Sequence, residues 1–226
     1  MAEVIISSQK SLAVVLSKLE GFDHPRAALE QYPTDSEVAA ILIWSAVQQG
    51  DIKKRVVTDL GAGTGILSIG AALMEAKKVR AIECDSSAIE VLKRNIVRCE
   101  KLTGLKLKKK VEIREQSIEE LSAQHADTVI MNPPFGMQTK GADRVFLQKA
   151  METADVIYSI HNSKSTRFIE NMARERAWKI THKFFCDFAL KQTFLFHTKR
   201  IHRIPVLIVR MTSNLKVNSN NATQTL

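Results

Sequence analysis

Four consecutive residues, Asn132-Pro133-Pro134-Phe135, combine the polarity and the rigidity that binding of a planar amine requires. They follow the apolar run TVIM, which predicts a buried strand with Asn132 at its carboxyl end. The two prolines fix φ and remove two backbone donors, so the carbonyl oxygens of Asn132 and Pro133 are left as rigid acceptors. The Asn132 side-chain oxygen and a backbone carbonyl would then form a fork for one NH₂ group, with the Phe135 ring flat against a base. Prolines that only ended a strand would need neither Asn before them nor Phe-Gly after them.

A second candidate site is the turn DLGAGTG, which ends another predicted strand, RVVTDL. Gly61, Gly63 and Gly65 let the backbone approach a ligand closely and adopt positive φ. The dinucleotide-binding pattern GxGxxG requires a glycine where this chain has Ile66, so a pyrophosphate-binding turn is disfavoured. A tight turn between a strand and a helix would explain the glycines alone, but not their combination with the acids around them.

Acids end both of the strands next to this turn. Asp59 ends the first, and Glu83 ends the second, VRAIEC. This arrangement resembles the S-adenosylmethionine-dependent methyltransferases of the Rossmann-like class. The resemblance implies that Asp59 holds the turn or meets the methionine ammonium and that Glu83 accepts both ribose hydroxyls, because ligands of open sheets lie beyond the carboxyl strand ends. Asp85 is an alternative ribose ligand, since residues two apart in a strand point the same way.

With such a cofactor, the fork at Asn132 suits methyl transfer to a weakly nucleophilic amine. Two acceptors hold both hydrogens and favour a pyramidal nitrogen, so orientation and electrostatics replace a strong general base. The motif resembles the amino-methyltransferase signature (D/N/S)PP(Y/F/W), which covers adenine N6, cytosine N4 and protein glutamine methyltransferases.

Alternating strands and helices must position these residues. Seven runs predict strands, at 55–60, 79–84, 111–115, 128–132, 156–161, 178–185 and 204–211, and helical patterns separate most of the first five. This order predicts an α/β fold of the Rossmann-like class I methyltransferase type, with a mostly parallel seven-stranded sheet and helices on both faces. No helix separates the last two strands, so we expect an antiparallel pair at the sheet edge, joined by an irregular segment at 186–203.

The first 54 residues contain two helical patterns, at 7–19 and 36–48, and Ser7 or Ser8 can cap the first. We interpret 1–54 as a helical lid with a cofactor-contacting segment, 55–211 as the methyltransferase domain and 212–226 as a disordered tail, because the tail is polar and lacks periodicity.

The composition is that of a globular chain with a basic excess. Net charge is +9 over 226 residues, and six basic residues but no acid lie between Phe188 and Leu226. Such a surface suits nucleic acid or an anionic membrane surface, although solubility alone can explain it. Without a long apolar window or a signal-peptide core, we expect a cytoplasmic protein. The three cysteines form no CxxC pair and the histidines no HExxH motif, so we expect no catalytic metal.

A closer resemblance joins five segments in order: EQYPT, DLGAGTGILSIGA, DTVIMNPPFG, ADRVFL and YSIH. Together they resemble the methyltransferase-like protein 5 family of archaea and eukaryotes, over residues 28–211, and look more like its archaeal branch. The resemblance implies N6-adenine methylation of small-subunit ribosomal RNA. It implies Asn132, Pro133, Pro134 and Phe135 as the catalytic element. The cofactor contacts that it implies or that the glycine turn adds are Gln31, Thr34, Asp59, Gly61, Gly63, Thr64, Gly65, Ile66, Glu83, Ser117, Ile118 and Asn132. Many relatives have Asp at the position of Ser117.

Partners follow from the same resemblance. Basic and aromatic residues before the last predicted strand are candidate RNA contacts: Phe194, Lys199, Arg200 and Arg203. The resemblance also implies a small zinc-binding activator subunit that adds a strand to the sheet edge, although a charge-protected edge is almost as well supported. Two other functions stay open at this point: N5-glutamine methylation of a translation factor and RNA binding without catalysis.

Overall fold

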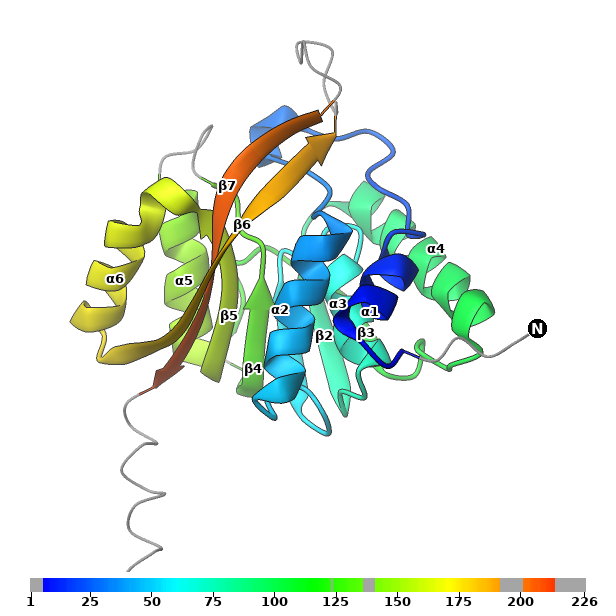
Figure 1. The fold of residues 1–226 in the computed structure, drawn as a ribbon, viewed down its shortest axis with the longest axis horizontal. Coiled ribbons are helices and arrows are strands. Elements are labelled where there is room, and N and C mark those ends of the chain that lie inside the picture. The colour runs from blue at the N-terminus through cyan, green and yellow to red at the C-terminus, as the bar shows by residue number, and fades with distance from the viewer. Residues whose placement is uncertain (1–5, 123, 136–140, 192–200, 214–226) are drawn as a thin grey trace, which may run out of the picture.

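The computed structural model describes residues 6–122, 124–135, 141–191 and 201–213, and a single sheet of seven strands forms its centre (Figure 1). The strand order is β3-β2-β1-β4-β5-β7-β6. The first five strands run parallel, and β7 pairs antiparallel with both β5 and β6. The strands are β1 Val56–Leu60, β2 Lys78–Glu83, β3 Val111–Glu115, β4 Ala126–Met131, β5 Ala154–Asn162, β6 Trp178–Lys191 and β7 Ile201–Ser213. The predicted fold class is therefore confirmed.

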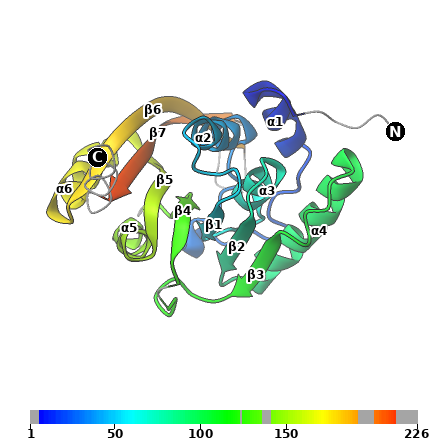
Figure 2. The same ribbon diagram turned by 90° about the horizontal axis from the view of Figure 1, so that it is seen from below.

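Helices cover both faces of the sheet (Figure 2). They are α1 Gln9–Leu16, α2 Ser36–Gln48, α3 Ile66–Leu73, α4 Ser86–Thr103, α5 Ala142–Thr153 and α6 Thr166–Glu175, with short 3₁₀ turns η1 Ala27–Leu29 and η2 Ser163–Ser165. One hydrophobic cluster joins α1 to α4 with one sheet face, and a second joins α5 and α6 with the other. Two buried apolar layers fix the position of every strand end.

The hairpin of β6 and β7 departs from the expectation of an irregular segment at 186–203. β6 continues to Lys191 and β7 begins at Ile201, with a ladder that pairs Phe188 with Ile204 and Lys191 with Ile201. The prediction was wrong because cross-strand hydrogen bonds, rather than local apolar alternation, extend these strands. In Figure 1 the hairpin rises past the ends of the parallel strands.

The N-terminal helices agree with their sequence signals. Ser8 caps α1 through a reciprocal pair of hydrogen bonds with Ser11, and α2 spans the residues predicted for it. Buried residues of both helices belong to the same cluster as β1 and β5. The boundary of the predicted lid at residue 54 stays a prediction. Residues 212–213 of the predicted tail end β7, and 214–226 lie outside the described residues. No helix in the described part of the chain is long and apolar enough to span a membrane.

Candidate active site

A cavity of about 330 Å³ lies at the carboxyl ends of β1, β2 and β4, where the sheet meets the segment between α1 and α2. This is the edge at which parallel strands of an open sheet present ligand-binding loops. The cavity brings together every residue predicted for catalysis and every predicted cofactor residue except Gly65: Gln31, Thr34, Asp59, Gly61, Gly63, Thr64, Ile66, Glu83, Ser117, Ile118, Asn132, Pro133, Pro134 and Phe135.

The glycine turn forms the floor of the cavity with a backbone that side chains would obstruct. Gly61 has φ of 69°, and a Cβ there would lie 2.9 Å from Cε1 of Phe146. Gly65 has φ of 90° and begins α3, and a Cβ there would lie 2.7 Å from Cγ of Leu92. Gly65 therefore shapes the turn from behind, which explains why it does not line the cavity.

Asp59 lies beneath this turn at the end of β1 and is 1% exposed. Its Oδ2 accepts a hydrogen bond of 2.6 Å from the Ser68 hydroxyl, while Oδ1 has no hydrogen-bond partner among the described residues. Burial, with a smaller contribution from the nearby Glu83, raises the pKa of Asp59 to about 7 against the lowering effect of the Ser68 hydrogen bonds. A buried acceptor without a partner is costly, so Oδ1 fits a cationic or N–H donor of a ligand.

Glu83 is held at the tip of β2 by backbone donors. Its Oε2 accepts from Gly63 N at 2.7 Å, and its Oε1 accepts from the amides of Cys84 and Asp85. A carboxylate has about four lone-pair sites, so these three bonds leave about one site, on Oε2, for a hydroxyl donor in the cavity. Asp85 points elsewhere: it caps α4 and accepts from Gln31 Nε2 at 2.7 Å. The geometry thus favours Glu83 over Asp85 as a ribose ligand.

Asn132 is oriented by one neighbour. Its Nδ2 donates to the Thr34 hydroxyl at 2.9 Å, and its buried Oδ1 has no hydrogen-bond partner within the described ranges. The amide therefore presents an acceptor at the end of β4. The Phe135 ring meets the Phe188 ring edge to face, with centroids 6.3 Å apart. Two aromatic rings and a free acceptor form the kind of pocket that binds a flat, NH-bearing group.

Comparisons with known proteins agree with this geometry. Residues 36–157 match the model of the methyltransferase small domain. The chain is 33% identical to the rRNA N(6)-adenosine-methyltransferase METTL5 of Danio rerio over 208 residues, which is 90% of this chain and 98% of that one. The chain belongs to the methyltransferase-like protein 5 family. It is also 36% identical to the uncharacterized protein MJ0284 of Methanocaldococcus jannaschii, over 90% of this chain and 93% of that one.

A solved structure of similar sequence extends the family match to the fold. The crystal structure of PH1948 from Pyrococcus horikoshii, a candidate RNA methyltransferase, is 42% identical and superposes with a TM-score of 0.84, over 92% of this chain and 99% of that one. As a member of the methyltransferase-like protein 5 family, the chain is an S-adenosylmethionine-dependent methyltransferase, and the fold implies that cofactor. The donor set fits it, because a glycine cradle and acceptors at Asp59, Glu83 and Asn132 face one cavity.

Sequence reasoning missed several residues of this methyltransferase cavity. Phe22, Phe146 and Phe188 line it, and the first two stand over Gly63 and Gly61. Glu119 also lines it, two residues after Ser117, whose hydroxyl instead accepts from Glu120 N. The lone Phe22 in a polar segment was the one signal available. Of the predicted RNA contacts, Phe194, Lys199 and Arg200 lie outside the described residues, and Arg203 is exposed on β7.

Proposed function

We propose that the protein transfers a methyl group from S-adenosylmethionine to the exocyclic N6 amine of an adenosine in small-subunit ribosomal RNA. The observation that carries this proposal is the Oδ1 atom of Asn132, which is buried and has no hydrogen-bond partner in the described structure. Asn132 is the first residue of the Asn-Pro-Pro-Phe segment, which lines the cavity. The Danio rerio relative is named as an rRNA N(6)-adenosine-methyltransferase, which supports the choice of adenosine in ribosomal RNA. With ribosomal RNA as its substrate, the protein is expected in the cytoplasm.

The chain's own residues position and polarise the amine. Thr34 accepts from Nδ2 of Asn132, so Oδ1 is the atom turned toward the substrate. Oδ1 and the carbonyl of Pro133 accept the two hydrogens of the amine, which concentrates the nitrogen lone pair on the open side. Phe135 stacks on the ring and Phe188 supports Phe135 from its edge. When bound, S-adenosylmethionine supplies an electrophilic methyl group on a sulfonium.

Two carboxylates hold the cofactor in this proposal. Glu83 accepts from a ribose hydroxyl through the remaining site of Oε2, and three backbone amides already orient it. Asp59, fully buried, meets the methionine ammonium, which stabilises its ionised form and lowers its pKa from about 7. The other proposed cofactor contacts between Gln31 and Ile118, apart from Gly65, line the same cavity.

The test is Asn132→Ala, with Asn171→Ala on the exposed face of α6 as the matched control. Loss of the acceptor should lower the rate of RNA methylation about 100-fold or more at saturating cofactor, where any weaker cofactor binding, measured separately by calorimetry, does not enter the rate. Labelled cofactor is supplied in parallel with total RNA and with a purified release factor, and methyladenosine is mapped in ribosomal RNA with and without the protein. Label only on the protein substrate, or an unchanged map, would contradict the proposal.

We further propose that a small activator subunit binds at the β3 edge, as the family resemblance implies. Three apolar side chains are exposed on and after α4, which packs beside β3: Val97, Leu102 and Leu105, at 45%, 41% and 40%. An edge strand next to exposed apolar surface favours strand addition by a partner. Leu102→Glu should abolish co-elution of the activator on size exclusion, whereas Val14→Glu on α1, also exposed, should not.

A further inference from the structure

The side of the molecule next to the cavity entrance carries cations and an exposed aromatic ring that the proposed reaction does not use. We call this surface the outer flank and define it by its residues: Arg144, Lys164, Arg167, Phe185 and Arg203. We propose that the outer flank binds the single-stranded RNA that adjoins the target nucleotide. This inference rests on the proposed function and names how its substrate is held.

The sheet topology places these residues on one face. β5 ends at Asn162, opposite Val206, and the hairpin continues beyond that end. Phe185 pairs with Leu207, which belongs to the core cluster under α5 and α6. Residues of a strand alternate between faces, so Phe185 and Arg203 both point to the face that α5 and α6 cover lower down. Because the hairpin extends past the end of β5, the residues of β7 before Val206 do not pair with β5.

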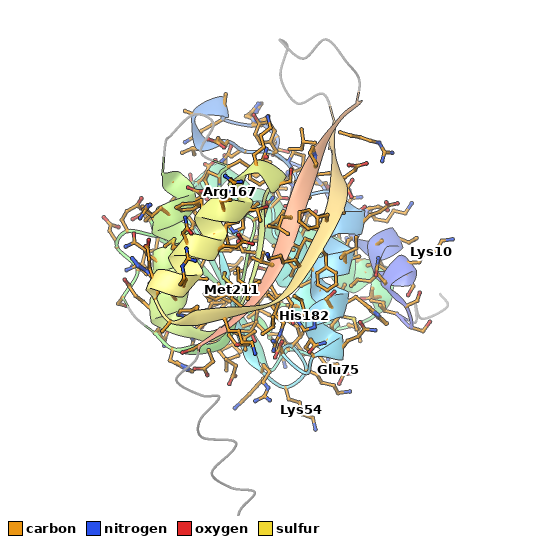
Figure 3. The ribbon with its side chains drawn as sticks, turned by 60° about the vertical axis from the view of Figure 1, so that its left-hand side comes forward. Lys10, Lys54, Glu75, Arg167, His182 and Met211 are labelled. Carbon is orange, nitrogen blue, oxygen red and sulfur yellow. The ribbon has the colours of Figure 1, made fainter. Side chains whose placement is uncertain are left out.

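The remaining cations come from the segments that begin at the same edge. Arg144 lies in the first turn of α5, Lys164 in η2 and Arg167 in the first turn of α6. Arg144 stacks over the Phe168 ring, with the guanidinium 5.2 Å from its centroid, which ties α5 to α6. Figure 3 shows Arg167 at the end of α6 beside the hairpin. Parallel strands thus deliver three exposed cations to the edge from which Asn132 emerges.

These cations are available for phosphates. Within the part of the chain that the structure describes, no ion pair engages Arg144, Lys164, Arg167 or Arg203. Arginines elsewhere differ: Arg94 is bound by Glu20 and Asp23. Asp143, Asp187 and Glu170 offset part of the charge, and Glu170, which is bound by Lys183, is also close enough to Arg167 for an electrostatic interaction. The four cations still outnumber these three acids. Exposed cations without an ion-pair partner are what a phosphate backbone requires.

Phe185 indicates the kind of nucleic acid. It is 65% exposed, more than any other large hydrophobic residue in the described part of the chain, although it lies in a strand. Three residues further, on the opposite face of β6, Phe188 is fully buried and lines the cavity. That separation is about 10 Å along a strand. An exposed ring stacks on an unpaired base, and a target adenine must leave any duplex to enter the cavity, so the occupant is single-stranded RNA rather than a helix.

The test measures binding of a labelled, unstructured RNA of roughly 12 nucleotides with one adenine, by fluorescence anisotropy over a salt series. The wild-type protein is compared with Lys164→Gln/Arg167→Gln/Arg203→Gln, and with Lys10→Gln/Lys54→Gln/Lys101→Gln as a charge-matched control. Lys10 and Lys54 lie far from Arg167 in Figure 3. Removing three phosphate contacts should make the slope of log K against log salt less negative by about 2, because each contact on a single strand contributes about 0.7. The control should keep the wild-type slope.

Phe185 provides an independent readout. Phe185→Leu should weaken binding about tenfold at every salt concentration without changing the slope, and Phe185→Trp should restore it, because stacking is not a phosphate contact. Equal loss in the flank triple variant and in its control would overturn the proposal. The proposal would also be overturned if Phe185→Leu bound RNA normally but no longer sedimented as a dimer that the wild type forms. That result would assign the Phe185 ring to a contact between two copies of the chain.

Failure of this surface is distinguishable from failure of the proposed function. If the wild-type protein methylates RNA while the flank variants bind RNA as tightly as it does, the proposed RNA contact at the outer flank is contradicted and the proposed function is retained. If RNA binding depends on the outer flank but no methyladenosine forms, the RNA contact is retained and the proposed function is contradicted. In the expected case, the triple variant raises KM for RNA at least tenfold and leaves kcat close to wild type, because the flank contacts RNA remote from the reacting amine.

Discussion

The glycine turn after β1 and the hairpin of β6 and β7 both line the cavity, but they do so by different physical means. The turn contributes backbone: Gly61, Gly63 and Gly65 all have positive φ. The hairpin contributes a side chain, Phe188, delivered by a ladder of cross-strand pairs. Residues in the turn are therefore constrained by atoms within a few ångströms, whereas the hairpin is constrained by pairing along its length. Substitutions in the first region should have abrupt effects and those in the second graded effects.

The largest expected effect concerns a buried acid beside the turn and a buried base beside the hairpin. Asp59 is fully buried with a pKa raised to about 7, and His161, on β5 opposite Leu207, is fully buried with a pKa lowered by desolvation to about 3. The stability that Asp59 contributes is present below its unfolded pKa of 3.8 and is lost as pH rises to about 7. That of His161 is present above 6.5 and is lost as pH falls to about 3. Each contribution amounts to about 4 to 5 kcal/mol, and the two change in opposite directions with pH between these limits.

Single variants should separate these contributions. Asp59→Asn leaves His161 to act alone, so the free energy of unfolding should fall as pH is lowered from 7 to 4. His161→Gln, which retains a polar partner for the Ser159 hydroxyl, should instead become more stable over that range. Urea unfolding at several pH values measures both. Parallel curves for the two variants would show that neither burial has the expected consequence.

The next effect tests how abruptly the turn responds. Gly65→Ala places a Cβ at 2.7 Å from Leu92 Cγ at a φ of 90°, and strain and overpacking together should cost about 3 kcal/mol of unfolding free energy. Gly104→Ala is the matched control: its φ is 75°, but nothing lies within 4 Å, so only the backbone term of about 1 kcal/mol remains. Chemical denaturation compares the two. Similar losses of unfolding free energy in both variants would mean that the Leu92 side chain moves aside and that packing does not constrain the turn.

The smallest effect concerns orientation rather than stability. Thr34→Val removes the hydroxyl that accepts from Asn132 Nδ2, and the freed amide should lower kcat about tenfold, since one such hydrogen bond is worth about 1 to 1.5 kcal/mol. Thr34→Ser keeps the hydroxyl and should retain wild-type kcat. Methylation assays at saturating cofactor separate this from a loss of cofactor binding. An unchanged kcat in Thr34→Val would show that the cavity itself holds the amide.

Much of the parallel half of the molecule was predictable. The β1 turn and the Asn-Pro-Pro-Phe segment are read from neighbouring residues, and the ends of parallel strands must meet at one edge. The antiparallel pair of the last two strands was also predicted, but its extension was not, because residues 186–191 and 201–203 have no strong local strand pattern and are ordered by their pairing across the chain. For the same reason the sequence did not predict that Phe146 and Phe188 line the cavity, because they reach it only through the packing of α5 and β6.

The sequence by itself determined the chemistry of the cavity: glycines where a Cβ does not fit, acids at two strand ends, and an amide before two prolines. These properties are local, since φ and donor loss belong to single residues. Tertiary structure alone decided that Asp85 binds Gln31 while Glu83 faces the cavity, and that Thr34 orients Asn132 from 98 residues away. It also decided that Phe188 turns inward and Phe185 outward. The reason is that packing and pairing over long sequence distances choose among side-chain directions that the local sequence leaves equal.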